Sequence, residues 1–310
     1  MRHREVAGAG GPDSGGREAV PAGGIPGREA HPLRPVGRAQ GPGPGQWAGG
    51  AAAGRVPDVS LKTLEFTLRN LGTLLVRHLD QLSEPDPSKL LELSTLYRRI
   101  GIGHLLAHHD VREFAENLFS SAETYLMLLR TQEPGAEGPR SLLARSRGVP
   151  LLDALCLGAW DLARDIDGAM PATWWSDVEE EEAFLYFKLL PALIDGKVDP
   201  GDARKLAALL EAEGTARLRA VDAVLRADER AFEDSLRTLT DDWRIAIEQD
   251  RETRPVDPYH DHTEAQVFIE GAALVRLARL RGLKAQERYD FIPASILRDL
   301  TQVLPSSVMG

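Results

Sequence analysis

The chain has 310 residues and a formal net charge of −10, from 37 Lys and Arg against 47 Asp and Glu. This acidic balance disfavours direct nucleic-acid binding, because the phosphates would be repelled, whereas an acidic surface suits a basic protein partner. The single cysteine, Cys156, excludes an internal disulfide and a cysteine-based zinc site. No uninterrupted apolar run reaches the length of about 18 residues that indicates a membrane span. We therefore expect a cytoplasmic protein without a cofactor.

The first 56 residues have the composition of a disordered segment. They contain 15 Gly and 7 Pro, and only scattered apolar residues such as Trp47. Such a segment cannot bury enough apolar surface to offset the backbone entropy lost on ordering. We therefore expect a disordered Gly/Pro/Arg-rich tail at residues 1–56, although a translation start at Val56 would remove it. The tail holds seven Arg and four acids, so residues 57–310 carry −13.

From Pro57 onward, apolar residues recur at spacings of three and four, which is the period of amphipathic helices. We expect helices at residues 60–82, 88–110, 110–132, 150–166, 180–196 and 199–214, a helical hairpin at 215–250, a long helix at 263–281 and a short final segment at 289–300. No window alternates with the period of two that indicates a strand. The sequence therefore predicts an all-α fold, an array of about eight to ten mostly antiparallel helices forming a single domain.

Capping residues and helix breakers mark the ends of these segments. The expected N-caps, whose side-chain oxygens would accept hydrogen bonds from first-turn amides, are Ser60, Ser88, Asp110 and Asp228. Gly214 and Gly282 are expected to stop their helices. Pro191 should kink or end the helix that contains it, because proline lacks the amide that the helix needs.

The stretch from Tyr259 to Gln266, YHDHTEAQ, is a candidate metal site. Two zinc ligands on a helix need a spacing of four residues to share a face, but His260 and His262 are two residues apart. In a loop they could converge with Glu264, which leaves this trio as a weak candidate set of ligands.

Helix capping explains the same stretch more completely. Thr263 with Gln266, and Asp261 with Glu264, each have the spacing of a capping box. Either pair would satisfy free amides at the start of the last long helix. We therefore favour capping over metal binding at this position.

A second metal arrangement is that of all-α phosphohydrolases of the HD type. These enzymes use a His, then a His-Asp pair, then a distant Asp. His78, the pair His109 and Asp110, and either Asp161 or Asp165 occur in that order. Asp110 is equally the natural N-cap of the helix that follows, so a metal-dependent hydrolase is an alternative to a binding protein.

Two clusters of acids and tryptophans are candidate contact surfaces for a basic partner. Their residues are Trp174, Trp175, Glu179, Glu180, Glu181, Glu182, Asp241, Asp242 and Trp243. Exposed tryptophans beside charged residues are typical of interface anchors. The alternatives are that the acids form a solvated first helical turn favoured by the helix dipole and that the tryptophans are buried in the core.

The order of several C-terminal segments resembles the immunity protein 49 family. The segments are LLDALCLGAWDLARDI, FLYFKLLPALIDG, RLRAVDAVLRADERAFEDSLRTLTDDWR, EGAALVRLARLRGL and YDFIPASIL. The resemblance covers roughly residues 60–300 and includes no catalytic motif. It implies an all-helical bacterial immunity protein that binds and neutralises a secreted polymorphic toxin, and it carries over no site residue. A helical scaffold protein without a toxin partner is a further alternative.

Overall fold

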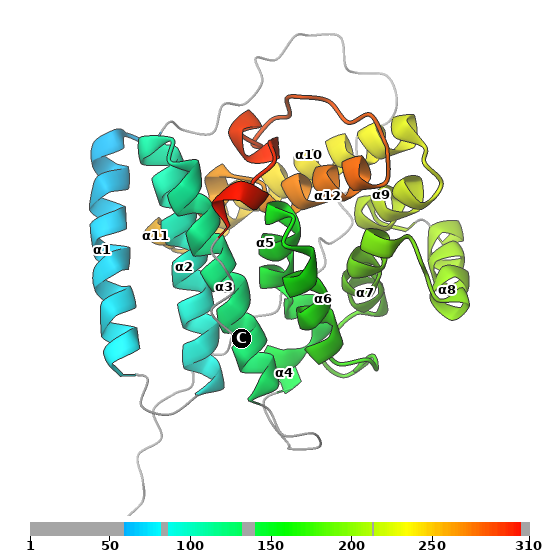
Figure 1. Cartoon of the computed structure of the whole chain (residues 1–310), viewed down its shortest axis with the longest axis horizontal. Helices are drawn as coiled ribbons and strands as arrows, with labels where there is room; N and C mark the ends of the chain where they lie inside the picture. The colour runs from blue at the N-terminus through cyan, green and yellow to red at the C-terminus, as the bar shows by residue number, and fades with distance from the viewer. Residues whose placement is uncertain (1–58, 82–85, 132–139, 213, 305–310) are drawn as a thin grey trace, which may run out of the picture. The chain divides into compact units, whose positions relative to one another are not determined.

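The computed structural model describes residues 59–81, 86–131, 140–212 and 214–304, which belong to one compact unit (Figure 1). These residues form twelve α-helices, of which α4 and α11 have only four and five residues. They contain no β-strand, only an isolated bridge between Tyr289 and Ile292. The predicted all-α class is confirmed. The predicted tail at residues 1–56 lies outside the described residues.

The first three helices pack side by side in chain order (Figure 1). They are α1 (Leu61–Asp80), α2 (Pro87–His108) and α3 (Val111–Arg130). The predicted N-caps Ser60 and Asp110 are confirmed, because their side chains accept hydrogen bonds from first-turn amides. The predicted cap Ser88 is wrong. Asp86 accepts from the Ser88 amide at 2.8 Å, since Pro87 takes the first helical position and leaves the cap to the residue before it.

The helix predicted at 150–166 is two helices. They follow the short α4 (Arg140–Leu143) and are α5 (Val149–Leu157) and α6 (Trp160–Ala169). The break is at Gly158, which has a φ of 73° and donates its amide to the Leu155 carbonyl. A left-handed residue turns the chain out of the helix, and glycine adopts this conformation without steric cost. The apolar run across residues 151–159 concealed the break.

The next two helices are α7 (Glu181–Asp195) and α8 (Pro200–Glu211). Pro191 lies inside α7, which continues to Asp195, so the proline does not end the helix. Its missing amide leaves the Phe187 carbonyl without the usual helical hydrogen bond. The predicted stop at Gly214 is wrong, because α8 ends at the C-cap Ala212, two residues earlier.

The predicted hairpin at 215–250 is confirmed. It consists of α9 (Ala216–Leu225) and α10 (Glu229–Thr253), which pack against each other. Asp228 is the N-cap of α10, as predicted, and accepts from the Ala231 amide at 3.0 Å.

The helix predicted at 263–281 begins later than expected. A short α11 (Pro258–His262) is followed by a 3₁₀ turn at Glu264–Gln266, and α12 runs from Ile269 to Leu280. The predicted capping boxes are wrong, because Thr263 ends α11: its amide and hydroxyl donate to the carbonyls of His260 and Tyr259. Gly282, with a φ of 88°, follows α12 and confirms the predicted stop.

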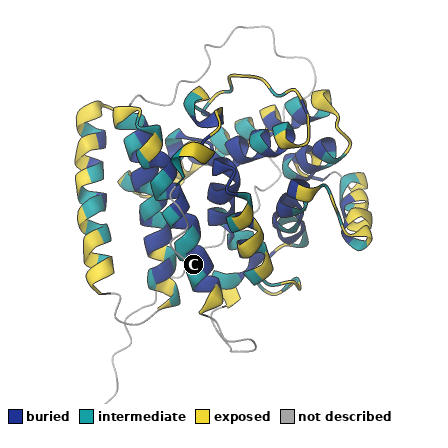
Figure 2. Cartoon of the chain, in the orientation of Figure 1, coloured by how far each residue is buried: buried dark blue, intermediate teal, exposed yellow. Residues whose placement is uncertain are grey.

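The main hydrophobic core lies around α5 and α12, which pack against each other (Figure 2). Seven of the nine residues of α5 are buried apolar side chains, and the helix also buries Asp153. Helix α1 lies at the edge and shares a separate, small cluster with α2, built on Leu71, Leu96 and Ile100. None of the described helices has the length and apolar composition needed to cross a membrane.

Candidate functional site

The segment from Asp257 to Gln266 is held in place by arginines. Glu264 accepts a hydrogen bond from Arg99 Nε at 2.7 Å and lies 3.4 Å from Arg98 Nε. Burial would raise the pKa of Glu264, but the charges of the two guanidinium groups outweigh it, and the pKa is lowered. Arg99 also binds Asp257 at 3.0 Å, so one side chain of α2 fixes both ends of the segment.

The same segment also contacts α1 and α10. His262 Nδ1 lies 2.9 Å from Thr67 Oγ1, and Thr67 is a buried residue of α1. Arg251 of α10 donates to Asp261 at 2.6 Å. We call residues 257–266 the polar clamp, because their side chains join α11 to α1, α2 and α10.

A buried polar network lies beneath the clamp. Arg98 forms an ion pair with Asp153 at 2.9 Å, and Ser121 donates to the other Asp153 oxygen at 2.8 Å. The Ser94 hydroxyl completes the network by donating to the Ser121 carbonyl. Asp153 is 0% exposed, and burial raises its pKa to about 6 despite Arg98 and Ser121. Sequence reasoning missed this network, although a lone acid in the apolar run LLDALCL was a signal for it.

Of the proposed metal ligands His260, His262 and Glu264, the last two have other contacts. Glu264 faces two guanidinium groups and His262 faces Thr67. In the part of the chain that the structure describes, no three His, Cys, Asp or Glu side chains are grouped so that they could hold a metal ion. The geometry of the segment is that of a structural clamp.

The HD-type candidates are also engaged elsewhere. His78 Nε2 contacts Glu92 at 2.9 Å, while His109 is the left-handed C-cap of α2. The Asp110 carboxylate caps α3, as described above. The two candidates for the distant acid form ion pairs with arginines: Asp161 with Arg164, and Asp165 with Arg130.

The tryptophans of the first acidic cluster are half-buried. Trp174 donates its indole hydrogen to the Glu179 carbonyl at 2.8 Å, and the Arg140 guanidinium lies over the Trp175 ring. Glu179 itself is 8% exposed and accepts from the Ser146 amide at 2.7 Å. This part of the cluster secures the loop before α7.

The other three acids of this cluster differ in their surroundings. Glu181 pairs with Lys205 at 2.9 Å, and Glu182 accepts from the Thr215 amide at 3.1 Å. Glu180 is exposed and has no side-chain partner among the described residues. It is therefore the acid of this cluster that remains available for contact with another molecule.

In the second cluster the tryptophan and the acids are separated. Trp243 packs between Phe268 and Phe291, with both ring centroids at 5.1 Å, and so belongs to the core. Asp241 and Asp242 are exposed on α10. Asp241 contacts Arg244 at 3.4 Å, whereas Asp242 has no ion pair within the described ranges.

A bidentate ion pair lies near these acids, between α9 and α12. Arg217 donates to both carboxylate oxygens of Glu270, at 2.7 and 2.8 Å, and its guanidinium lies over the Tyr186 ring. Burial would raise the pKa of Glu270, but the charge and hydrogen bonds of Arg217 lower it. No local spacing indicates this pair, because its partners are 53 residues apart.

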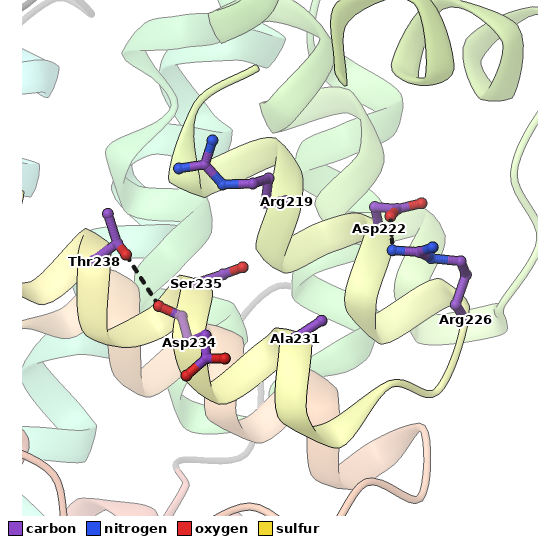
Figure 3. A pocket seen from close by; sticks show the side chains of 7 residues that line it. All are labelled: Arg219, Asp222, Arg226, Ala231, Asp234, Ser235 and Thr238. Atoms are coloured by element: carbon purple, nitrogen blue, oxygen red, sulfur yellow. Dashed lines mark hydrogen bonds and ion pairs between the residues drawn. The ribbon is translucent and has the colours of Figure 1, made fainter. Parts of the chain in front are cut away.

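A shallow groove of about 270 Å³ lies between α9 and α10 (Figure 3). Its lining residues are Arg219, Asp222, Arg226, Ala231, Asp234, Ser235 and Thr238. The charged side chains at its rim are already paired, as with Asp222 and Arg226, or bound to backbone, as with Arg219 and the Gly214 carbonyl. The groove therefore presents no unpaired charged side chain that would attract a ligand of opposite charge.

Comparison of the chain with protein-family models, with curated proteins and with solved structures finds no match.

Proposed function

We propose that the protein binds and neutralises a toxin domain with a basic surface, acting as a stoichiometric immunity protein. The observation that carries the proposal is the pair of exposed, adjacent carboxylates Asp241 and Asp242 on α10. The order of helical segments, which resembles that of the immunity protein 49 family, supports the same function.

The electrostatics of Asp242 favour a cationic partner. Loss of part of its hydration at the protein surface and the adjacent charge of Asp241 raise the pKa of Asp242, and this effect exceeds the opposing influence of Arg219 and Arg217. The negative charge of the ionised pair is therefore only partly balanced by positive charges of the chain. A Lys or Arg side chain placed across Asp241 and Asp242 would relieve the repulsion, and complementary charge would also accelerate encounter.

The acids of the first cluster contribute less to this proposal. Glu180 is open to a partner, but the side chains of Glu179, Glu181 and Glu182 already have contacts within the chain. We therefore place the centre of the acidic contact at α10 and propose Glu180 as a second contact point.

The proposal is tested by co-expression with the toxin domain encoded in the adjacent reading frame. The wild-type protein is expected to rescue growth and to co-purify with the toxin in a 1:1 complex. The double variant D241K/D242K is expected to weaken binding by at least about 30-fold, since losing a buried charge pair at an interface costs roughly 2–5 kcal/mol.

Glu252→Lys is the matched control, because Glu252 is exposed on the same helix and lies outside the proposed contact. It should bind like the wild type. Absence of both rescue and complex with the wild-type protein would contradict the proposed function. A complex that D241K/D242K leaves intact would contradict the proposed contact surface.

A further inference from the structure

Helix α1 has a broader apolar side than its neighbours cover. Leu64, Thr67 and Leu71 are buried against the rest of the fold. Beside them lies an apolar stripe that includes strongly exposed side chains: Leu61 is 53% exposed, Val76 58% and Leu79 46%. The residues of this α1 stripe are Leu61, Leu68, Leu75, Val76 and Leu79. Leu68 and Leu75 also pack against the small cluster that α1 shares with α2, and the charged residues Glu65 and Arg69 are exposed on the same side of the helix. Figure 2 shows α1 at the edge of the described fold with much of its surface exposed.

The ends of the stripe match each other when one copy of α1 is reversed against another. Leu61 and Leu79 are 18 residues apart, which is about five turns of an α-helix, so they lie on one line along its surface. Lys62 and Asp80 have the same separation and lie on a second line, about 100° around the helix from the first. In an antiparallel pair with two-fold symmetry, Leu61 meets Leu79 of the other copy and Lys62 meets its Asp80.

The charged side chains on this line lie at the surface. Lys62 and Asp80 are both exposed, and neither forms an ion pair with another of the described residues. The two-fold axis repeats each contact, so one such pairing creates two leucine contacts and two ion pairs of opposite charge. A parallel arrangement would instead place Lys62 beside Lys62 and Asp80 beside Asp80.

Gly72 lies near the middle of the stripe, where two antiparallel helices would cross. A Cβ atom built on Gly72 has no heavy atom within 4 Å outside its own helical backbone and chain neighbours, so no other described part of the fold fills this position. Small residues at a crossing point let two helix backbones approach closely.

We propose that the α1 stripe is a self-association surface, through which two copies of the chain pair by antiparallel contact of their α1 helices. The occupant is a second copy because the two exposed ends of α1 exchange places under two-fold symmetry: Leu61 meets Leu79, and Lys62 meets Asp80. The contact area of one helix is small compared with that of obligate dimers, so the dimer forms and dissociates with concentration. This association goes beyond toxin binding and does not depend on it.

The test measures the mass of the full-length protein by light scattering and sedimentation from about 1 µM to about 1 mM. The wild type should change from monomer to dimer across this range. Leu79→Glu should remain monomeric, because the variant replaces a leucine contact by a charge that faces Leu61 of the other copy. Phe66→Glu is the matched control: Phe66 is 62% exposed, but it lies about 140° around the helix from Leu61. It should dimerise like the wild type.

Charge reversal identifies the pairing. Lys62→Asp and Asp80→Lys should each weaken self-association by roughly tenfold, since each creates two like-charge contacts of the size of surface ion pairs. A mixture of the two variants should form heterodimers in preference to homodimers, because Asp at position 62 then meets Lys at position 80. The double variant K62D/D80K should regain the wild-type affinity.

A wild-type protein that stays monomeric over the whole concentration range would overturn the proposal. A dimer that Leu79→Glu does not weaken would overturn it as well, by placing the interface elsewhere. Failure of the mixed variants to pair would exclude the antiparallel arrangement.

Discussion

Substitution of Glu264 by Gln tests whether the polar clamp is structural. The variant keeps the shape of the side chain but removes the charge that faces Arg99 Nε at 2.7 Å and Arg98 Nε at 3.4 Å. Hydrogen bonds to charged groups contribute about 1.5–3 kcal/mol each. Glu264 and Arg99 are 19% and 17% exposed, so water screens the contacts in part. We expect the free energy of unfolding to fall by about 2–3 kcal/mol.

The assay is urea unfolding of the wild type and the variant at several pH values. Because the pKa of folded Glu264 is lowered, its stabilising effect is present above its ordinary pKa of 4.5 and is lost as the pH falls through the lowered value. The difference between wild type and Glu264→Gln should therefore be largest at neutral pH and shrink in acid. Glu252→Gln, on the exposed side of α10, should change stability by less than about 0.5 kcal/mol.

Equal stability of wild type and Glu264→Gln at neutral pH would refute this account of the clamp. A chelator provides a second criterion. If a bound transition metal held the segment together, chelation would destabilise the wild type and leave the variant unchanged. The arginine clamp predicts no effect of the chelator on either protein.

Three further predictions concern stability and use the same unfolding assay. Gly158→Ala should lower the free energy of unfolding by about 1–2 kcal/mol, because alanine is strained at a φ of 73°. Gly168→Ala in α6 should raise it by about 0.5 kcal/mol, since the added Cβ meets open space. Equal effects of the two substitutions would contradict this explanation. Asp228→Ala should cost about 1 kcal/mol through loss of the α10 cap, and no change would contradict the capping role. The pKa of Asp153 is raised to about 6, so its contribution is present below about 3.8 and lost as the pH rises through 6. Relative to Asp153→Asn, the wild type should lose up to about 3 kcal/mol over this window, and parallel pH profiles would contradict the shift.

The fold class was predictable because helical periodicity depends on local sequence. Ser60, Asp110 and Asp228 were identifiable as caps for the same reason, since each acts on amides within three residues. The break at Gly158 was not predicted, because the apolar pattern continues across it. The late start of α12 was missed because Thr263 has the sequence context of an N-cap, but its hydroxyl turns back to the Tyr259 carbonyl.

The candidate site was less predictable, because its residues meet through tertiary packing. Acids that are neighbours in the sequence differ in their exposure to solvent: Glu179 is buried, whereas Glu180 beside it is exposed. Arg99, which binds Glu264, lies 165 residues earlier in the chain, and no local pattern indicates this contact. Trp243 also reads as an interface residue from its acidic neighbours, yet its partners Phe268 and Phe291 come from later segments.

The most direct test of the proposed function is a calorimetric titration of the purified protein with the toxin domain that we expect in the adjacent reading frame, at low and at moderate salt. We expect one toxin per chain, loss of toxin activity at equivalence, and an affinity that D241K/D242K weakens more strongly at low salt than at moderate salt. Absence of heat and of inhibition at any ratio, with both proteins folded, would contradict it.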